Sequence, residues 1–519
     1  MKTWIKNICV LAVLFSLGSC VEDDTVDTFG EINKVTFGKM ENKYSVMLYD
    51  KLQIPLQITT SMNDESNLSY AWYIYTRTSR YEADTLSRDR DLDVVIDPTK
   101  ATPGEDYTLG VKVTDELTGV YYRKDMKLEV TSQFTKGTVL LCKENNKPVL
   151  NFLTAGKERK LIDHVYSRSN GGESLKGNPV HVYAIDPNRY ASFMKQVLVF
   201  CEEEDGGVIL DPITFEKVKP LRKAFESVAN PGVLHPSFYT QHEIGIDYIL
   251  LDGKICKRGV NMQRMDWEAP LVCTEGPGDY EVAPHSWNID YMQTFYDRKH
   301  NRLLQHYRWN MGALHQMGVG EDSDLSCFDP NNIGENMEML CCGDLSGYNF
   351  FWMLMKNSVT GKFYVYKFHV DDDSFISIQK TELTTKQAPH IEEAIDFSVN
   401  QYSTDVLMFS TKDKVFSLAL NLLDENTSYI IEACQVDLSA KNMEITGFDF
   451  VPIDYVDEET GKYMPSDQLR LYVKDNNLSQ LKGGIAFYEV NYMGGIHADF
   501  LYSKTGFCDE VVEVSEKYN

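Results

Sequence analysis

Three tryptophans fall within one stretch in the second half of the chain and are the residues best suited to hold a ligand. Trp267 and Trp287 lie in a long segment that also carries several prolines, and Trp309 follows in the next apolar run. Exposed indole rings bind sugars and peptides through a large flat surface that loses few rotamers on binding. We therefore predict these tryptophans as ligand-binding residues, with the alternative that each fills a gap between packed sheets.

The sequence lacks the short motifs that mark common catalytic and metal sites. His242-Glu243 is not followed by the second His of an HExxH zinc site, and neither GxSxG nor GxxxxGK[ST] occurs. Two acidic runs, 202–205 and 371–373, lack the alternate spacing and the glycine of an EF-hand loop, so they are interpreted as solvated turns. We expect no metal, no cofactor and no identifiable catalytic residue. The carboxylates of a glycosidase would escape this reasoning, because their spacing is spatial and not sequential.

Four histidines are concentrated between residues 285 and 315, where they would meet a metal only if the fold brought them to one point. Their spacing is irregular, which disfavours such a site. They are His285, His300, His306 and His315.

The first twenty residues have the pattern of an export signal. Lys2 and Lys6 give a cationic start, residues 8–17 are apolar, and small residues precede Cys20. This order is typical of a secretory signal, and the apolar run is shorter than the roughly 20 residues that a spanning helix needs.

The residues around Cys20 make this signal more specific. Leu17-Gly18-Ser19-Cys20 resembles the lipobox of bacterial lipoproteins, which implies that residues 1–19 are removed and that the Cys20 thiol carries lipid. Glu22-Asp23-Asp24 resembles the surface-export signal of Bacteroidota-type lipoproteins, which implies an outer-membrane anchor with the protein facing the cell exterior. The alternatives are an ordinary signal with a chance cysteine and a merely solvated acidic tether.

Composition describes a globular body with a strongly negative field. The 519 residues are 43% hydrophobic and 25% charged, so the chain is long enough for several domains with sizeable cores. A net charge of −26 repels phosphate backbones, which excludes nucleic acid as a favoured partner. Neutral glycans, peptides and cations remain compatible ligands.

The eleven cysteines do not form a recognisable framework. Loss of Cys9 with the signal and lipidation of Cys20 leave an odd number, and no pair of CxxC motifs occurs. Most of the rest lie in apolar runs, where a free thiol behaves as a small hydrophobic group. Cys341 and Cys342 are interpreted as two strand thiols that face opposite ways, in preference to a strained redox disulfide.

After a polar tether over 20–34, residues 35–132 predict an immunoglobulin-like β-sandwich. The stretch contains several short segments in which apolar and polar residues alternate with the period of a half-buried strand, most clearly over 107–115. Trp72 in a central aromatic strand and the turn at Gly119 complete a pattern that resembles the PKD-like family of lipoprotein domains. In that pattern Trp72 is a core residue.

Residues 135–519 repeat one unit, an apolar strand, a polar turn and a second apolar strand. Asp-Gly and Gly-Gly turns between apolar runs indicate hairpins, and a hairpin cannot bury its face alone. The copies occupy residues 139–152, 197–210, 248–256, 294–304, 350–369, 406–418 and 469–491. Seven stacked units predict an all-β protein whose second domain is a seven-bladed β-propeller, with a large multi-sheet sandwich as the alternative.

Three long stretches interrupt the repeat, at 216–229, 258–292 and 310–349. Long insertions in a compact fold are commonly functional, so we expect recognition on the propeller, centred on 258–349. The order of domains resembles accessory lipoproteins of SusC/SusD-type nutrient-uptake systems. That resemblance implies a non-catalytic outer-membrane component that binds a glycan or peptide beside a SusC/SusD-type transporter. The alternative is a propeller-fold hydrolase acting at the cell surface.

Overall fold

The structure is a computed structural model, which describes residues 32–517 with gaps. The gaps are 77–82, 104, 156–158, 186–194, 226–231, 243–244, 260–265, 290, 308–312, 372–373, 400–404, 437–441, 457–462 and 492–495, and for 242, 451–456 and 463–467 only the backbone is described. The predicted sites Cys20 and Trp309 lie outside the described residues. The chain divides into two compact units, Met1–Ser132 and Gln133–Asn519.

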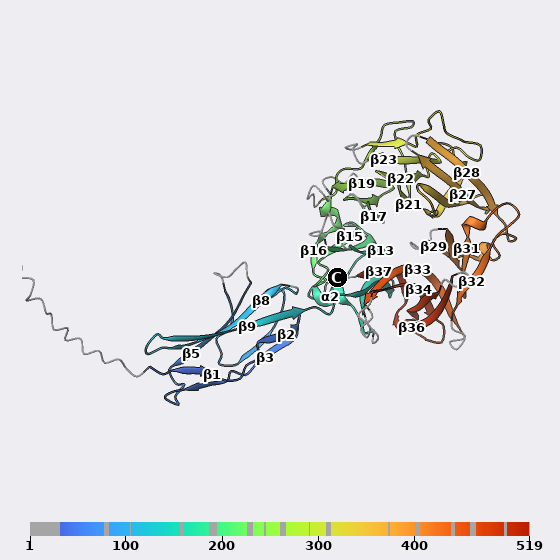
Figure 1. The fold of residues 1–519 in the computed structure, drawn as a ribbon. Coiled ribbons are helices and arrows are strands. Elements are labelled where there is room, and N and C mark those ends of the chain that lie inside the picture. Colours follow the sequence, from blue (N-terminus) through green and yellow to red (C-terminus); the bar gives the residue numbers. More distant parts are fainter. Residues whose placement is uncertain are drawn as a thin grey trace, which may run out of the picture. The chain divides into compact units, whose positions relative to one another are not determined.

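The first unit is a β-sandwich (Figure 1). Its main sheet has the order β2-β9-β8-β5-β6, and two ribbons, β1-β4 and β3-β7, pack against it. The strands are β1 (Val35–Phe37), β2 (Lys43–Met47), β3 (Lys51–Ile54), β4 (Ile58–Thr60), β5 (Leu68–Thr76), β6 (Asp84–Ser87), β7 (Leu92–Val95), β8 (Asp106–Asp115) and β9 (Tyr121–Thr131). Trp72 is 0% exposed and its Nε1 donates to the Arg90 carbonyl at 3.1 Å, so the predicted core role of this residue is confirmed.

The second unit is built from seven sheets arranged around a centre (Figure 1). We number these sheets as blades 1 to 7. Blade 1 contains β10 (Gly137–Glu144), β11 (Lys147–Thr154), β12 (Leu161–Ile162) and β37 (Glu510–Lys517), blade 2 contains β13 (Asn178–Ile185), β14 (Gln196–Glu202), β15 (Gly207–Leu210) and β16 (Lys217–Pro220), and blade 3 contains β17 (Pro236–His242), β18 (Ile246–Leu251) and β19 (Lys254–Gly259). Blade 4 contains β20 (Val272–Cys273), β21 (Val282–Ile289), β22 (Met292–Asp297), β23 (Arg302–Tyr307) and β24 (Ala313–Gln316), and blade 5 contains β25 (Met337–Asp344), β26 (Phe350–Asn357), β27 (Phe363–Asp371) and β28 (Ser374–Leu383). Blade 6 contains β29 (Asp396–Val399), β30 (Val406–Ser410), β31 (Lys414–Ala419) and β32 (Ile430–Gln435), and blade 7 contains β33 (Met443–Val456), β34 (Tyr463–Asp475), β35 (Gly483–Asn491) and β36 (His497–Cys508).

The predicted hairpins are confirmed, because each of the seven is an antiparallel strand pair of one blade. In blade 3, which has three described strands, the pair includes the outer edge strand β19. Their turns follow from local chemistry. Asn145 and Asn146 both have positive φ, 51° and 59°, which a two-residue turn between twisted strands requires and which Asn tolerates. The predicted seven-bladed propeller is therefore the fold of this unit.

The ring closes through a strand from the far end of the chain. The last strand, β37, pairs antiparallel with β10, with Leu140 opposite Val514. The innermost strands then contact one another in the order β37, β13, β17, β21, β25, β29, β33 and back to β37. The inner edge strands are thus protected by their neighbours, and blade 1 depends on residues from both ends of the unit.

The predicted interruptions are in part blade strands, which corrects the sequence interpretation. The stretch 258–292 contains β20 and β21, and 310–349 contains β24 and β25. In β21 the register shifts between Val282 and Ser286, around Pro284, because proline cannot donate to a ladder and is confined to edges and bulges. Because β21 contains a proline and several polar residues, the sequence pattern did not identify it as the inner edge strand of its blade.

Among the residues that the structure describes, helical structure is confined to short connections between strands. These are α2 (Val165–Ser169), η1 (Leu221–Ala224), η3 (Ile391–Glu393) and η4 (Leu420–Leu422). In the part of the chain that the structure describes, no helix has the length and apolar character needed to cross a membrane.

Candidate functional site

Two of the three tryptophans that were predicted to bind a ligand are described, and neither has an exposed ring. Trp267 is 0% exposed, stacks on Phe225 with ring centroids 5.5 Å apart, and carries the Arg258 guanidinium 3.9 Å above its ring. Trp287 on β21 is 2% exposed, and its Nε1 donates to the Trp352 carbonyl at 3.2 Å. The predicted ligand role of both is wrong. Large rings fill the space between neighbouring blades, which must be packed without voids.

The histidines that are concentrated between residues 285 and 315 lie in separate places in the structure. His300 contacts Asp279 at 2.9 Å and His315 contacts Glu275 at 3.2 Å, both near the surface. His306 is fully buried with its Nδ1 2.8 Å from the Tyr248 hydroxyl. Within the described ranges, no group of three His, Cys, Asp or Glu side chains is arranged to hold a metal ion.

The adjacent cysteines Cys341 and Cys342 lie on β25 and face opposite ways, as predicted. Cys341 belongs to the apolar cluster between blades 5 and 6, and Cys342 packs toward blade 4, where its thiol donates to the Ser286 carbonyl at 3.5 Å. Burial raises the pKa of both thiols, so neither behaves as a nucleophile.

The strongest concentration of polar chemistry lies on the strands around the centre of the propeller. The central residue of this group is Glu513 of β37, and each of its two carboxylate oxygens contacts a residue from another blade. Oε2 lies 3.0 Å from the His181 Nδ1 of β13, and Oε1 accepts from the Tyr472 hydroxyl of β34 at 2.8 Å. His285 of β21 and Asp396 of β29 lie within electrostatic reach of these groups. We call these five residues the central cluster.

Local irregularities in the strands aim these side chains. The β13–β14 register shifts between Pro179 and His181, and the β10–β37 register shifts beside the position opposite Glu513. Such bulges re-aim single side chains and are common next to functional sites. At Gly447 of β33 a Cβ atom would lie 2.9 Å from the Tyr472 ring and 3.2 Å from Asp396 Oδ2, so only glycine lets these two side chains approach.

Burial and neighbouring groups set the charge of each member. Burial would raise the pKa of Glu513, but its bonds from His181 and Tyr472 outweigh this effect and hold that pKa below its usual range. Burial, with the nearby His181, lowers the pKa of His285 to about 4. At neutral pH the cluster thus holds an ionised Glu513 and a neutral His285.

Asp396 behaves differently from Glu513. Its Oδ1 accepts from the Phe397 N–H at 2.8 Å and its Oδ2 from the Phe448 N–H at 2.9 Å. Burial and the negative charge of Glu513 nevertheless raise the pKa of Asp396 to about 6. This carboxyl group therefore exchanges its proton close to neutral pH.

A second set of buried polar residues links blade 7 to blade 1 near the central cluster. Arg470 of β34 is 1% exposed and binds both oxygens of Asp449, with Nε 2.8 Å from Oδ1. Its Nη1 donates to Glu516 of β37 at 3.1 Å, and Glu516 also accepts from the Thr138 hydroxyl of β10 at 2.8 Å. This network joins blade 7 to blade 1 at the point of closure.

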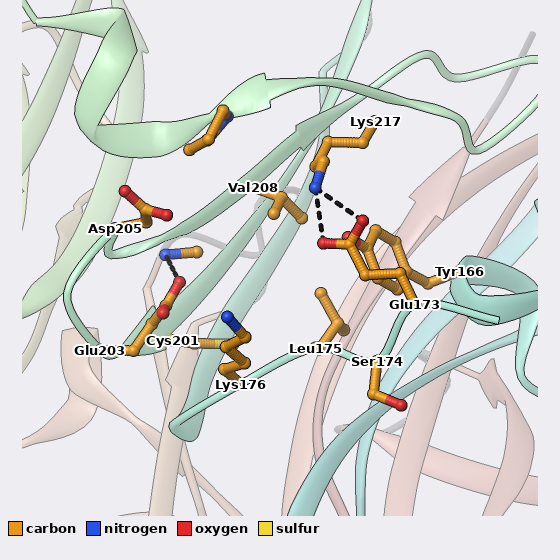
Figure 2. Close-up of a pocket in the computed structure, with 12 residues that line it drawn as sticks. Tyr166, Glu173, Ser174, Leu175, Lys176, Cys201, Glu203, Asp205, Val208 and Lys217 are labelled. Atoms are coloured by element: carbon orange, nitrogen blue, oxygen red, sulfur yellow. Dashed lines mark hydrogen bonds and ion pairs between the residues drawn. The ribbon is translucent and has the colours of Figure 1, made fainter. Parts of the chain in front are cut away.

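A small hollow lies on blade 2, apart from the central cluster (Figure 2). On one side the Lys217 Nζ binds both oxygens of Glu173, at 2.5 and 2.7 Å. On the other side Glu203, in the β14–β15 turn, accepts from the Gly207 N–H at 3.2 Å. The acidic run 202–205 is thus a turn, as predicted, and the charges of Lys217 and Glu173 already compensate one another.

The arrangement at the centre suits recognition of hydroxyl or cationic groups. Carboxylates accept hydrogen bonds from ligand hydroxyls and ammonium groups, and a neutral imidazole both donates and accepts. None of this was predicted, because His181 and Glu513 lie at opposite ends of the propeller sequence and belong to no motif. The only signals in the sequence are polar residues within apolar strands.

Comparison with known proteins identifies a family for the N-terminal part of the chain. Residues 20–179 match the model of a family described as the PKD-like family, as the resemblance of residues 35–132 predicted. No functionally curated protein matches the chain.

Solved structures with similar folds have low sequence identity. A quinoprotein alcohol dehydrogenase-like protein from Bacteroides thetaiotaomicron is 11% identical, with 92% of this chain and 97% of that chain covered and a TM-score of 0.45. A protein from Lactobacillus plantarum is 10% identical, with 73% of this chain and 99% of that chain covered and a TM-score of 0.43.

The raised pKa of Asp396 predicts a measurable pH dependence of stability. A folded-state pKa of about 6, above the ordinary 3.8, means that its stabilising contribution is complete below about pH 4 and is lost as the pH rises through 6. Between pH 4 and pH 8 wild type should therefore lose about 2 kcal/mol of stability relative to Asp396→Asn. The Asn amide nitrogen cannot accept one of the two backbone hydrogen bonds, and that loss shifts the variant's curve by an amount that does not change with pH.

The measurement is the free energy of unfolding of both proteins by denaturant at several pH values. Asp499→Asn, which changes an exposed carboxylate on β36, is the matched control and should follow the wild-type curve. Parallel curves for wild type and Asp396→Asn would show that Asp396 titrates normally.

Proposed function

We propose that this protein is a lipid-anchored outer-membrane component that faces the cell exterior and holds a glycan or peptide beside a SusC/SusD-type transporter. The observation that carries the proposal is the start of the PKD-like match at residue 20, which is the cysteine of the lipobox-like Leu17-Gly18-Ser19-Cys20. The family match therefore begins at the residue where the export signal is predicted to be cleaved, which supports cleavage before Cys20. The propeller then provides the binding part of an anchored protein.

The central cluster supports binding as the role of the propeller. His181, His285, Asp396 and Glu513 come from the inner strands of four different blades. His181 contacts Glu513, and His285 and Asp396 lie within electrostatic reach of this pair. A rigid ring holds such groups in fixed positions, which favours recognition because little conformational freedom is lost on binding. Neutral polyhydroxyl ligands fit this mixture of carboxylate, imidazole and phenol groups.

One observation favours the alternative function, a surface hydrolase. Asp396 has a pKa of about 6 and lies within electrostatic reach of the ionised Glu513. Glycosidases use a carboxyl group with a raised pKa as general acid beside an ionised carboxylate. In this alternative Asp396 would donate the proton and Glu513 would stabilise the developing positive charge.

The test combines location, partner and turnover in the native type of host. Wild type should fractionate with outer membranes and, after detergent extraction, should co-purify with a SusC/SusD-type pair. Cys20→Ala should stay uncleaved or leave the membrane fraction. Retention of Cys20→Ala as a mature membrane lipoprotein would contradict the anchor, and extraction of wild type without a SusC/SusD-type pair would contradict the partner.

Binding and hydrolysis are separated on the purified chain. We expect candidate glycans or peptides to bind without turnover, and Glu513→Gln to weaken that binding. Products that disappear in Asp396→Asn would instead establish the hydrolase.

A further inference from the structure

Two cysteine thiols meet where the last blade joins the first. Cys142 lies on β10 of blade 1, and Cys508 is the final residue of β36 of blade 7. Both side chains are 0% exposed and belong to one apolar cluster with Leu140 and Phe487. The two thiols are close enough to influence one another electrostatically. Nearly the whole propeller sequence separates them, so only ring closure brings them together.

The backbone around the pair is tightly fixed. Immediately after Cys508, the Asp509 N–H donates to the Lys143 carbonyl at 2.8 Å, and Lys143 then pairs with Glu510. The Asp509 carboxylate also accepts from the Asn145 N–H at 2.6 Å. On the other side, a Cβ at Gly483 would lie 2.7 Å from the Cys508 sulfur, so glycine leaves the space that this sulfur occupies.

We propose that Cys142 and Cys508 form a disulfide in the exported protein, which covalently joins blade 7 to blade 1. The proposal goes beyond the binding role and rests on export to an oxidising compartment, where disulfides persist. The other seven cysteines of the described chain remain free thiols. Closure of the propeller would then be covalent as well as hydrogen-bonded.

The oxidation follows ordinary thiol–disulfide exchange. One cysteine loses its proton and attacks the disulfide of an exported thiol oxidase, which forms a mixed disulfide and releases one oxidase thiolate. The second cysteine, also deprotonated, attacks that mixed disulfide and releases the oxidase as a dithiol. Two electrons pass to the oxidase, and the two protons lost by the cysteines are taken up by its thiolates.

The order of events follows from burial. In the closed ring, the neighbouring Cys142 thiol and burial hold the pKa of Cys508 far above its usual range, so little thiolate exists there. Oxidation therefore accompanies closure, before β37 has covered the two sulfurs. A crosslink across so long a segment restricts the unfolded chain strongly and should raise the temperature of unfolding.

The test uses full-length protein exported by a bacterial host with an outer membrane. The protein is isolated without reductant, denatured, alkylated and digested, and the peptides are weighed. We expect one crosslinked species containing Cys142 and Cys508, two hydrogens lighter than the separate peptides. On non-reducing gels wild type should migrate faster than after reduction, and Cys142→Ala and Cys508→Ala should lose this difference.

Cys201→Ala changes another fully buried thiol and should keep the faster migration, which makes it the matched control. If the cysteine variants fail to fold, the wild-type peptide map decides alone. Alkylation of both Cys142 and Cys508 in protein that has been cleaved at Cys20 would overturn the disulfide while leaving export intact.

If no cleavage occurs in the host, the proposed anchor fails and a second measurement judges the disulfide. The chain is refolded in oxidised and reduced glutathione and mapped in the same way. A crosslinked peptide supports the disulfide, and two free thiols overturn it.

Discussion

Replacing Arg258 with alanine is expected to destabilise the propeller by about 3–5 kcal/mol, because it leaves a buried carboxylate without its partner. Arg258 of β19 and Asp247 of β18 are directly opposite one another, and both side chains are 0% exposed. The Arg258 Nε lies 2.9 Å from Asp247 Oδ2, and the guanidinium also packs on the Trp267 ring. The variant loses the ion pair and the packing together.

The measurement is denaturant unfolding of the full chain at neutral pH. Arg298→Ala is the matched control, because it removes an arginine that pairs with Glu281 at the surface, where both side chains are about half exposed. Surface pairs contribute roughly 0–1 kcal/mol. Equal losses for Arg258→Ala and Arg298→Ala would show that burial of the first pair has no energetic consequence.

The same pair can be replaced without leaving a charge behind. A double variant with Asp247→Leu and Arg258→Met should recover much of the loss, since apolar replacements of buried ion pairs are commonly neutral. A double variant as unstable as Arg258→Ala would mean that the packing on Trp267 dominates the effect.

The sequence could predict the central hairpins because their signals are local. The Asp252-Gly253 turn lies between two apolar runs, and its positive φ values, 51° and 73°, are those that Asp and Gly tolerate. The flanking strands carry no such signal. Inner β21 contains Pro284, and outer β16 is the polar sequence Lys217–Pro220, so both resemble connections.

The candidate site could not be predicted for a related reason. Whether an aromatic residue is exposed or buried depends on the neighbouring blade, and Trp287 is buried because β21 turns its ring toward Phe368 of blade 5. The contact between His181 and Glu513 exists only after β37 returns to blade 1. Local patterns carry no information about such a contact.

Dependence on β37 leads to the second large prediction, that a chain ending at Asp509 should fail to form the propeller. The deletion removes the pairing of β10 with β37 and two buried valines, Val511 and Val514, each contributing about 1.5–3 kcal/mol. It also removes Glu513 and Glu516, which hold His181 and Arg470 at the closure. These losses together approach the roughly 5–15 kcal/mol by which native domains are stable.

The prediction is checked by thermal unfolding of the truncated chain and by hydrogen exchange. We expect the cooperative transition of the propeller to disappear while amides of the sandwich strands stay protected. A chain ending at Lys517 keeps the whole of β37 and is the matched control, with an unchanged transition. Adding a synthetic peptide of residues 510–519 should restore part of the protection in β10, because the peptide supplies the missing ladder. A truncated chain that unfolds at the wild-type temperature would show that β37 is dispensable for stability. It would also show that the propeller around the central cluster folds without Glu513.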